Sequence, residues 1–153
     1  MEKSKKLTLA DFLAAVPEQY KDFVTKTSEA LIKSGYKQKI EKKASGLTVT
    51  YNTPECKRVH LQFYFNKNIL GVNLHPIFFK LHNGSLDGLP SCITTQIDMF
   101  KDCRHVADPK SCNPTCYECK FTINGRQYHK CNYNRISVEV NEDSIGLLSV
   151  FRI

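Results

Sequence analysis

Leu47-Thr-Val-Thr-Tyr51, Val59-His-Leu-Gln-Phe-Tyr-Phe65 and Leu70-Gly-Val-Asn-Leu74 are the stretches of sequence that decide the fold. Apolar and polar side chains alternate along each stretch, which is the pattern of β-strands that bury one face only. Residues 66–68, Asn-Lys-Asn, are short enough to join the last two strands as an antiparallel hairpin. A weaker strand at about 38–42 precedes the first one, with a turn at 44–46 between them. The sequence therefore predicts an antiparallel meander.

Two amphipathic helices are predicted before this meander. The first runs from Thr8 to Val16, with the Thr8 hydroxyl as cap and Asp11 favoured in the first turn. The second begins at Pro17 and ends at Gly35. Its apolar positions recur at helical spacing and are Tyr20, Phe23, Val24, Thr27, Ala30 and Leu31. A helix with such a stripe is expected to pack on the sheet of its own domain.

The region after the meander is predicted to be less regular. Residues 76–89 hold several turn-forming Pro and Gly positions and are expected to be mostly loop, with Ile77-Phe-Phe79 inserted into the core. A helix is expected at about 91–101, and a final one after Asn141. The inward positions of the final helix are Ile145, Leu148 and Phe151.

These elements predict a single α+β domain over residues 1–153, because each amphipathic piece needs the others to cover it. The expected architecture is a two-layer sandwich with the helices on one face of a mostly antiparallel sheet. The opposite face should then be polar with one aromatic. Its residues are Thr48, Thr50, His60, Gln62, Tyr64, Asn73 and His75.

Composition and charge limit the classes of protein. The sequence has neither an apolar signal region near its start nor a run of about 18 apolar residues, so we expect a cytoplasmic protein without a membrane span. Its seven cysteines are then thiols or metal ligands rather than a disulfide framework. The net charge is +7, with +4 in residues 1–43 and another +4 in residues 101–135. Such basic regions favour weak, non-specific attraction to nucleic acid.

The most specific motif is a cluster of cysteines at Cys103, Cys112, Cys116, Cys119 and Cys131. Cys116 and Cys119 have the two-residue spacing of a zinc knuckle. Asn124-Gly125 predicts a hairpin turn whose register places Cys131 opposite Glu118 and beside Cys119. We therefore expect a structural zinc ion in a zinc-ribbon-like hairpin module at about 101–135, closed by cysteine ligands without a catalytic water.

In this module Cys116, Cys119 and Cys131 bind the ion and Cys112 or Cys103 completes the tetrahedron, but several alternatives stay open. Zinc can instead take Cys103, Cys112, Cys116 and Cys131, which leaves Cys119 free, and His105 and His129 are reserve ligands. The cysteines can also be buried thiols without metal, or a redox pair at Cys116 and Cys119. The remaining cysteines, Cys56 and Cys92, are expected to take no part.

The other side chains predict a binding or interaction protein of unknown ligand or partner rather than an enzyme. The chain has no recognisable catalytic or phosphate-loop motif. One alternative is a thiol or histidine enzyme that uses His60 and His75 near Tyr64. The other is a nucleic-acid-binding protein, since aromatic and basic residues alternate along the cysteine-rich segment. These residues are Tyr117, Phe121, Tyr128 and Tyr133 with Lys120, Arg126, Lys130 and Arg135.

Three segments resemble the YdhG/YdeI-like family of uncharacterised bacterial proteins. They are Asp11-Phe-Leu-Ala-Ala-Val-Pro-Glu-Gln-Tyr20 with the helix that follows, Asn68-Ile-Leu-Gly-Val-Asn-Leu-His-Pro76, and Ile145 to Arg152. The resemblance covers roughly half of the chain and implies a frataxin-like fold, with an iron-chaperone role in some members. The long helix offers few acids among its lysines, so iron delivery is not expected. The segment from Cys103 to Cys131 lies outside the resemblance.

Overall fold

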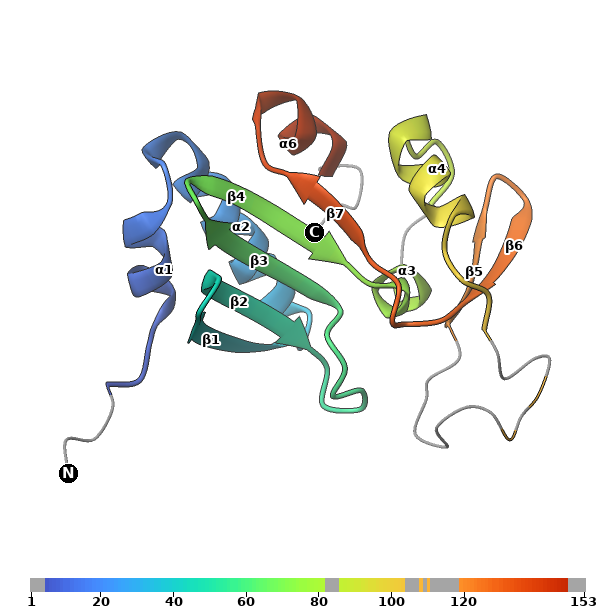
Figure 1. The fold of residues 1–153 in the computed structure, drawn as a ribbon, viewed down its shortest axis with the longest axis horizontal. Helices are drawn as coiled ribbons and strands as arrows, with labels where there is room; N and C mark the ends of the chain where they lie inside the picture. The colour runs from blue at the N-terminus through green and yellow to red at the C-terminus, as the bar shows by residue number, and fades with distance from the viewer. Residues whose placement is uncertain (1–4, 82–85, 104–107, 109, 111–118, 149–153) are drawn as a thin grey trace.

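The computed structural model of the protein describes residues 5–81, 86–103, 108, 110 and 119–148 (Figure 1). Helices and antiparallel strands are both present, which confirms the α+β class. The two ends of the described chain form a sheet covered by helices, and the residues between them, 76–130, add a smaller lobe made of short helices and a hairpin (Figure 1).

The main sheet is antiparallel and contains the predicted meander. Its strands, in spatial order, are β1 (Lys37–Lys43), β2 (Gly46–Asn52), β3 (Leu61–Asn66), β4 (Ile69–Leu74) and β7 (Ile136–Glu139). Lys67 and Asn68 have positive φ angles of 49° and 64°, as the central residues of a type I′ hairpin turn do. Strand β7, which pairs with β4, was not predicted, although Ile136, Val138 and Val140 alternate with polar residues.

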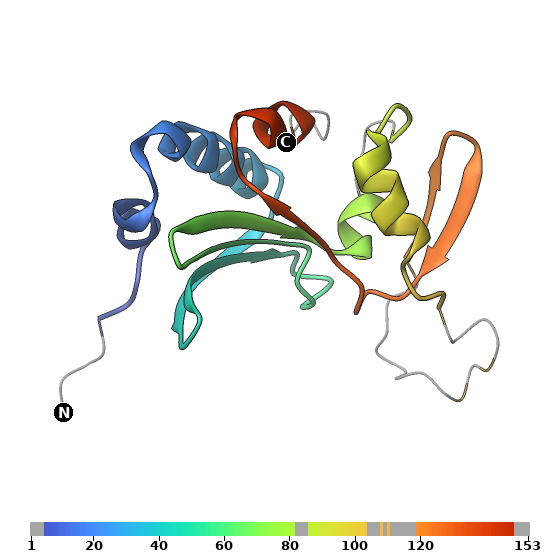
Figure 2. The same ribbon diagram turned by 45° about the horizontal axis from the view of Figure 1, so that its top comes forward.

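One face of this sheet carries helices. The helices α2 (Glu18–Lys33) and α6 (Glu142–Leu148) lie on the same side of the strands, and α1 (Leu9–Ala15) lies beside one end of the sheet (Figure 2). Phe12, Val24 and Leu31 from the helices are buried in one apolar cluster with the sheet residues Val49 and Phe63. The two-layer arrangement of helices on one face of the sheet is therefore present in the described part of the chain.

The smaller lobe is formed by α3 (Pro76–Leu81), α4 (Ser91–Asp98), β5 (Cys119–Ile123) and β6 (Arg126–Lys130). The prediction that residues 76–89 are mostly loop is wrong at α3, where a one-and-a-half-turn helix buries Ile77, Phe78 and Phe79. Proline is favoured at a helix start, and burial of the three apolar side chains offsets their modest helix propensity. Phe79 and Phe121 belong to the same apolar cluster as the main core, so both parts share one interior.

Candidate binding face and cysteine cluster

The side of the sheet opposite α2 and α6 carries a row of polar side chains. Ser137 on β7 donates to Asn73 Oδ1 at 2.6 Å. Asn73 Nδ2 then donates to Gln62 Oε1 at 3.2 Å, and Gln62 Nε2 donates to Thr50 Oγ1 at 3.3 Å. This chain of hydrogen bonds crosses the four strands β2, β3, β4 and β7. We call this side the polar face and define it by Thr48, Thr50, Gln62, Tyr64, Asn73 and Ser137.

A shallow groove of about 420 Å³ lies on the polar face. Its lining residues are Lys43, Ser45, Leu47, Thr48, Gln62, Tyr64, Asn66, Asn73, Arg135 and Ser137. Tyr64 lies across the strand pair directly over Gly71, so that a Cβ atom at Gly71 would fall inside the phenol ring. Glycine is therefore needed at this position to let the aromatic ring lie against the sheet.

The groove is electrostatically positive. Lys43 and Arg135 line it, and neither forms an ion pair with a carboxylate within the described residues. Among the residues that the structure describes, no acidic residue lines the groove. Glu41 lies on the same side of β1 but is paired with Lys39 at 2.8 Å, and this hydrogen bond lowers the pKa of the Glu41 carboxyl. A ligand with negative charge or many acceptor atoms suits such a surface.

The expectation that His60 lies on an exposed polar face is wrong. Its side chain is fully buried and meets the Tyr36 ring edge-on at 5.3 Å. Neither ring nitrogen has a hydrogen-bond partner in the described part of the chain, and burial lowers the pKa of His60 to about 4. The Cys56 backbone lies near the His60 ring and acts to raise its pKa, but it does not meet the geometry of a hydrogen bond. The alternation of apolar and polar residues in β3 predicted the strand correctly. It did not predict how the His60 side chain packs at the end of that strand.

His75 is half-buried. Its Nδ1 lies 3.1 Å from the backbone oxygen of Asn132, and burial lowers the pKa of the His75 imidazole. Neither His60 nor His75 lines the groove on the polar face or the hollow on the hairpin. The structure therefore does not bring these two histidines together with Tyr64 in an open site.

The hairpin of the smaller lobe has the predicted register. Ile123 pairs with Arg126 and Cys119 pairs with Lys130 around the Asn124-Gly125 turn. Directly paired residues point to the same face, and neighbours along a strand point to opposite faces. Cys119 therefore lies on the face of Lys130, and Cys131 lies on the other face. The inference that this register joins Cys119 and Cys131 in one site stays a prediction, and the pleat of the hairpin argues against it.

Cys119 has an interior environment instead. It is fully buried in a small apolar cluster with Cys56 and Ile77, and its thiol donates to Asn132 Oδ1 at 3.8 Å. A thiol that donates a hydrogen bond is protonated, whereas zinc binds the thiolate. Of the two ligand sets that the sequence left open, the one without Cys119 fits this geometry.

Cys103 and Cys131 lie on the same face as His129. Asp102 forms a bridge with Lys130, the Cys103 N–H bonds to the His129 carbonyl and the Cys131 N–H to the Lys101 carbonyl. This short ladder places Cys103 opposite His129 and diagonal to Cys131. Among the described residues no three potential ligands are close enough to hold a metal ion. Cys112, Cys116 and His105 lie outside the described residues.

The aromatic and basic side chains of the hairpin are mostly engaged in internal contacts. Phe121 and Tyr128 are buried and stacked on each other, with centroids 5.4 Å apart. Arg126 pairs with Asp98 at 3.0 Å. Lys130, only 7% exposed, pairs with Asp102 at 2.7 Å and donates to the carbonyl of Phe100. Tyr133 is exposed beneath the guanidinium of Arg58, and Tyr117 lies outside the described residues.

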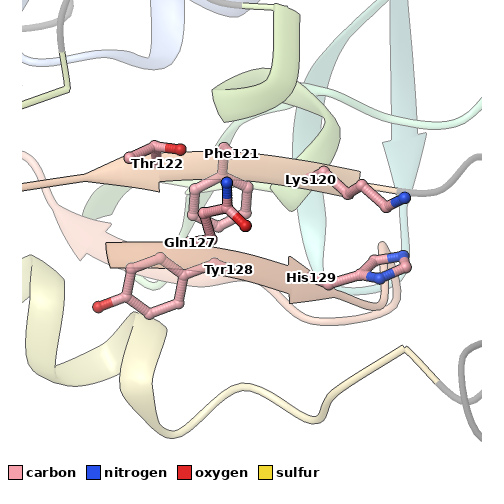
Figure 3. A pocket seen from close by; sticks show the side chains of 6 residues that line it. All are labelled: Lys120, Phe121, Thr122, Gln127, Tyr128 and His129. Atoms are coloured by element: carbon pink, nitrogen blue, oxygen red, sulfur yellow. The ribbon is translucent and has the colours of Figure 1, made fainter. Parts of the chain in front are cut away.

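A second hollow, of about 450 Å³, lies along this hairpin. Its lining residues are Lys120, Phe121, Thr122, Gln127, Tyr128 and His129 (Figure 3). Lys120 and His129 form a cross-strand pair at one end, and Thr122 and Gln127 form the next pair. Within the described part of the chain, the lining of the hollow includes one lysine and lacks a chain of hydrogen-bonded amides, so it offers fewer recognition groups than the polar face.

Asn132 is an important residue that the sequence reasoning did not single out. It is buried, and its side-chain oxygen accepts hydrogen bonds from the Ile77 N–H at 2.8 Å and from the Cys119 thiol. Its backbone oxygen contacts His75. Asn132 therefore ties α3, the hairpin and the end of β4 together. No local sequence pattern marks an asparagine whose partners are so distant along the chain.

Comparisons with known proteins give no relative from which a function can be transferred. No family model matches the chain, and no curated protein or solved structure matches it. The resemblance to the YdhG/YdeI-like family therefore stays a prediction. Within the described ranges, every helix is too short or too polar to cross a lipid bilayer.

Proposed function

We propose that the protein is a binding protein whose ligand lies on the polar face of the main sheet. The groove that crosses this face is the observation that supports the proposal. It gathers hydroxyl, amide, phenol and cationic groups from separate strands, and the hydrogen bonds among Thr50, Gln62, Asn73 and Ser137 hold them in fixed orientations. Ordered polar groups lose less conformational entropy when a ligand binds.

The character of the groove favours binding over catalysis. Reaction at a protein side chain needs a nucleophile or an acid–base group in an open site. The described lining of the groove consists of amides, hydroxyls, one phenol, two cations and the apolar Leu47. His60 and Cys119, the chemically most reactive types nearby, are buried away from it.

A thermal-shift panel tests the polar face. The probes are nucleoside monophosphates, sugar phosphates, short acidic peptides and short single-stranded oligonucleotides. We expect at least one probe to raise the melting temperature of the wild type and to lose this effect in Ser137→Trp, which fills the groove from an exposed strand position. Thr122→Trp, on the exposed side of the hairpin, is the matched control and should respond like the wild type. A panel without any response, or a response lost only in Thr122→Trp, contradicts the proposal.

We also propose a structural zinc ion beside the hairpin, held by Cys103 and Cys131 together with Cys112 and Cys116. The shared face of the first two cysteines supports this set, and the interior position of Cys119 argues against its membership. Zinc would crosslink the segment between α4 and β5 to the hairpin and so stabilise the smaller lobe. The ion has no direct part in ligand binding at the polar face.

A further inference from the structure

We propose that the groove on the polar face binds a short stretch of single-stranded nucleic acid, with phosphates contacted by Lys43 and Arg135. This inference rests on the proposed function, because it names the ligand class of the same groove. It is carried by three features of the groove: the separation of its two cations, the sign of its charge, and the hydrogen-bonding groups between them.

The two cations lie at opposite corners of the sheet. Lys43 is the last residue of β1 and pairs with Gly46. Arg135 directly precedes β7, whose first residue Ile136 pairs with Leu74. The strands β1 and β7 are the two edges of the sheet and are four strand spacings apart, which amounts to about 19 Å across the strands alone, and the two residues also lie at opposite ends of the strands. A ligand that contacts both cations needs anionic groups that are well separated, as successive phosphates of a nucleic-acid strand are.

The charge of this face suits a polyanion. The alternation of β1 places Lys37 and Lys39 on the same side as Lys43, so the β1 edge of the polar face carries three lysines, of which Lys43 lines the groove. The acids on this side are Glu41, which is paired with Lys39, and Glu139, which does not line the groove. The basic regions 1–43 and 101–135, far apart in the sequence, each supply one end of the groove.

The middle of the groove suits nucleotide bases. Gln62 and Asn73 each use one side-chain N–H in the chain of hydrogen bonds and keep a second one for a ligand. Base edges carry several carbonyl and ring-nitrogen acceptors that such donors can bind. Tyr64, held against the sheet over Gly71, supplies an aromatic ring near the centre. Single-stranded nucleic-acid sites combine aromatic rings with a basic groove in this way.

The shape of the groove favours a nucleic-acid strand over the other anionic ligands. Small-molecule sites are usually enclosed and mostly apolar, whereas this groove runs across a sheet and is lined mainly by polar groups. A free nucleotide can contact only one of its two cations. A duplex pairs its Watson–Crick edges and stacks its bases, so it offers neither those edges to Gln62 and Asn73 nor a free base face to Tyr64.

Fluorescence anisotropy tests the inference. The probe is a fluorescein-labelled uridine oligomer of about 12 nucleotides, titrated with the full chain at about 50 mM and about 200 mM salt. Two phosphate contacts predict that affinity falls by about sevenfold over this range. The affinity of the variant Lys43→Ala/Arg135→Ala should no longer fall between the two salt concentrations. Tyr64→Leu should weaken binding at both salt concentrations. Lys6→Ala/Lys33→Ala removes the same charge from exposed positions elsewhere and should bind within about twofold of the wild type.

Each other outcome overturns the inference in a recognisable way. Equal loss of affinity in both double variants means that net charge, not the groove, attracts the oligomer. Equal or tighter binding of free uridine monophosphate, competed against the labelled strand, identifies a small-anion site. In a third outcome the oligomer does not bind while another member of the thermal-shift panel still stabilises the wild type but not Ser137→Trp. That result removes this inference and leaves the proposed function standing. Circular dichroism of every variant confirms that the fold is retained.

Discussion

Acidification from about pH 7 to about pH 5 should destabilise the protein through His60. The pKa of His60 is lowered from 6.5 to about 4 by burial, so the folded state holds the imidazole neutral while the unfolded chain binds a proton more readily. The contribution of the neutral ring to stability is complete above the unfolded pKa and is lost as the pH falls towards the folded pKa. This linkage predicts a loss of about 2 kcal/mol in the free energy of unfolding at pH 5.

Urea denaturation at several pH values measures this loss. His60→Phe keeps an aromatic ring against Tyr36 and removes the titrating group, so its free energy of unfolding should vary much less between pH 7 and pH 5. His75→Gln is the comparison, because burial also lowers the pKa of His75 and it should account for part of the remaining slope. The lowered carboxyl pKa values of Asp11, Glu41 and Asp102 act at more acidic pH. An unchanged pH dependence in His60→Phe would refute the reasoning.

Three further changes test the packing and the cysteine cluster. Asn132→Ala should lower the free energy of unfolding by about 2–3 kcal/mol, because it leaves a buried backbone N–H without its acceptor; a urea titration showing a neutral effect contradicts this. Elemental analysis should find about one zinc per chain in the wild type and in Cys119→Ala but none in Cys131→Ser. Equal loss of zinc from Cys119→Ala and Cys131→Ser would show that Cys119 is a ligand. Gly71→Ala should cost about 1–3 kcal/mol, and Tyr64→Ala in the same chain should relieve most of that cost, whereas additive effects would show that the two residues do not clash.

The main sheet could be predicted from the sequence because its signals are local. Alternation over six or seven residues fixes a strand, and the Asn124-Gly125 turn fixes the hairpin register by counting. The strand β7 has the same alternation, but it is short and pairs with β4 from more than 60 positions away, so local context does not assign it to the sheet. Helix α3 escaped prediction because turn residues surround it.

The candidate sites were less predictable because they depend on which way side chains point. Counting the register correctly placed Cys131 near Cys119 along the hairpin, and only the pleat shows that their side chains diverge. His60 continues the polar alternation of β3, yet the chain folds over the strand end and buries it against Tyr36. The groove combines Lys43 with Arg135, and no sequence pattern links positions so far apart.

An NMR titration of ¹⁵N-labelled protein with the single-stranded uridine oligomer tests the central claim most directly. Binding at the polar face predicts shifts for the side-chain amides of Gln62 and Asn73 and for the backbone amides of Thr50 and Ser137, because these groups form the row across the groove. Amides of α2, on the covered side of the sheet, should stay unchanged (Figure 2). Shifts confined to the hairpin residues 119–130, or no shifts on addition of the oligomer, would contradict the account.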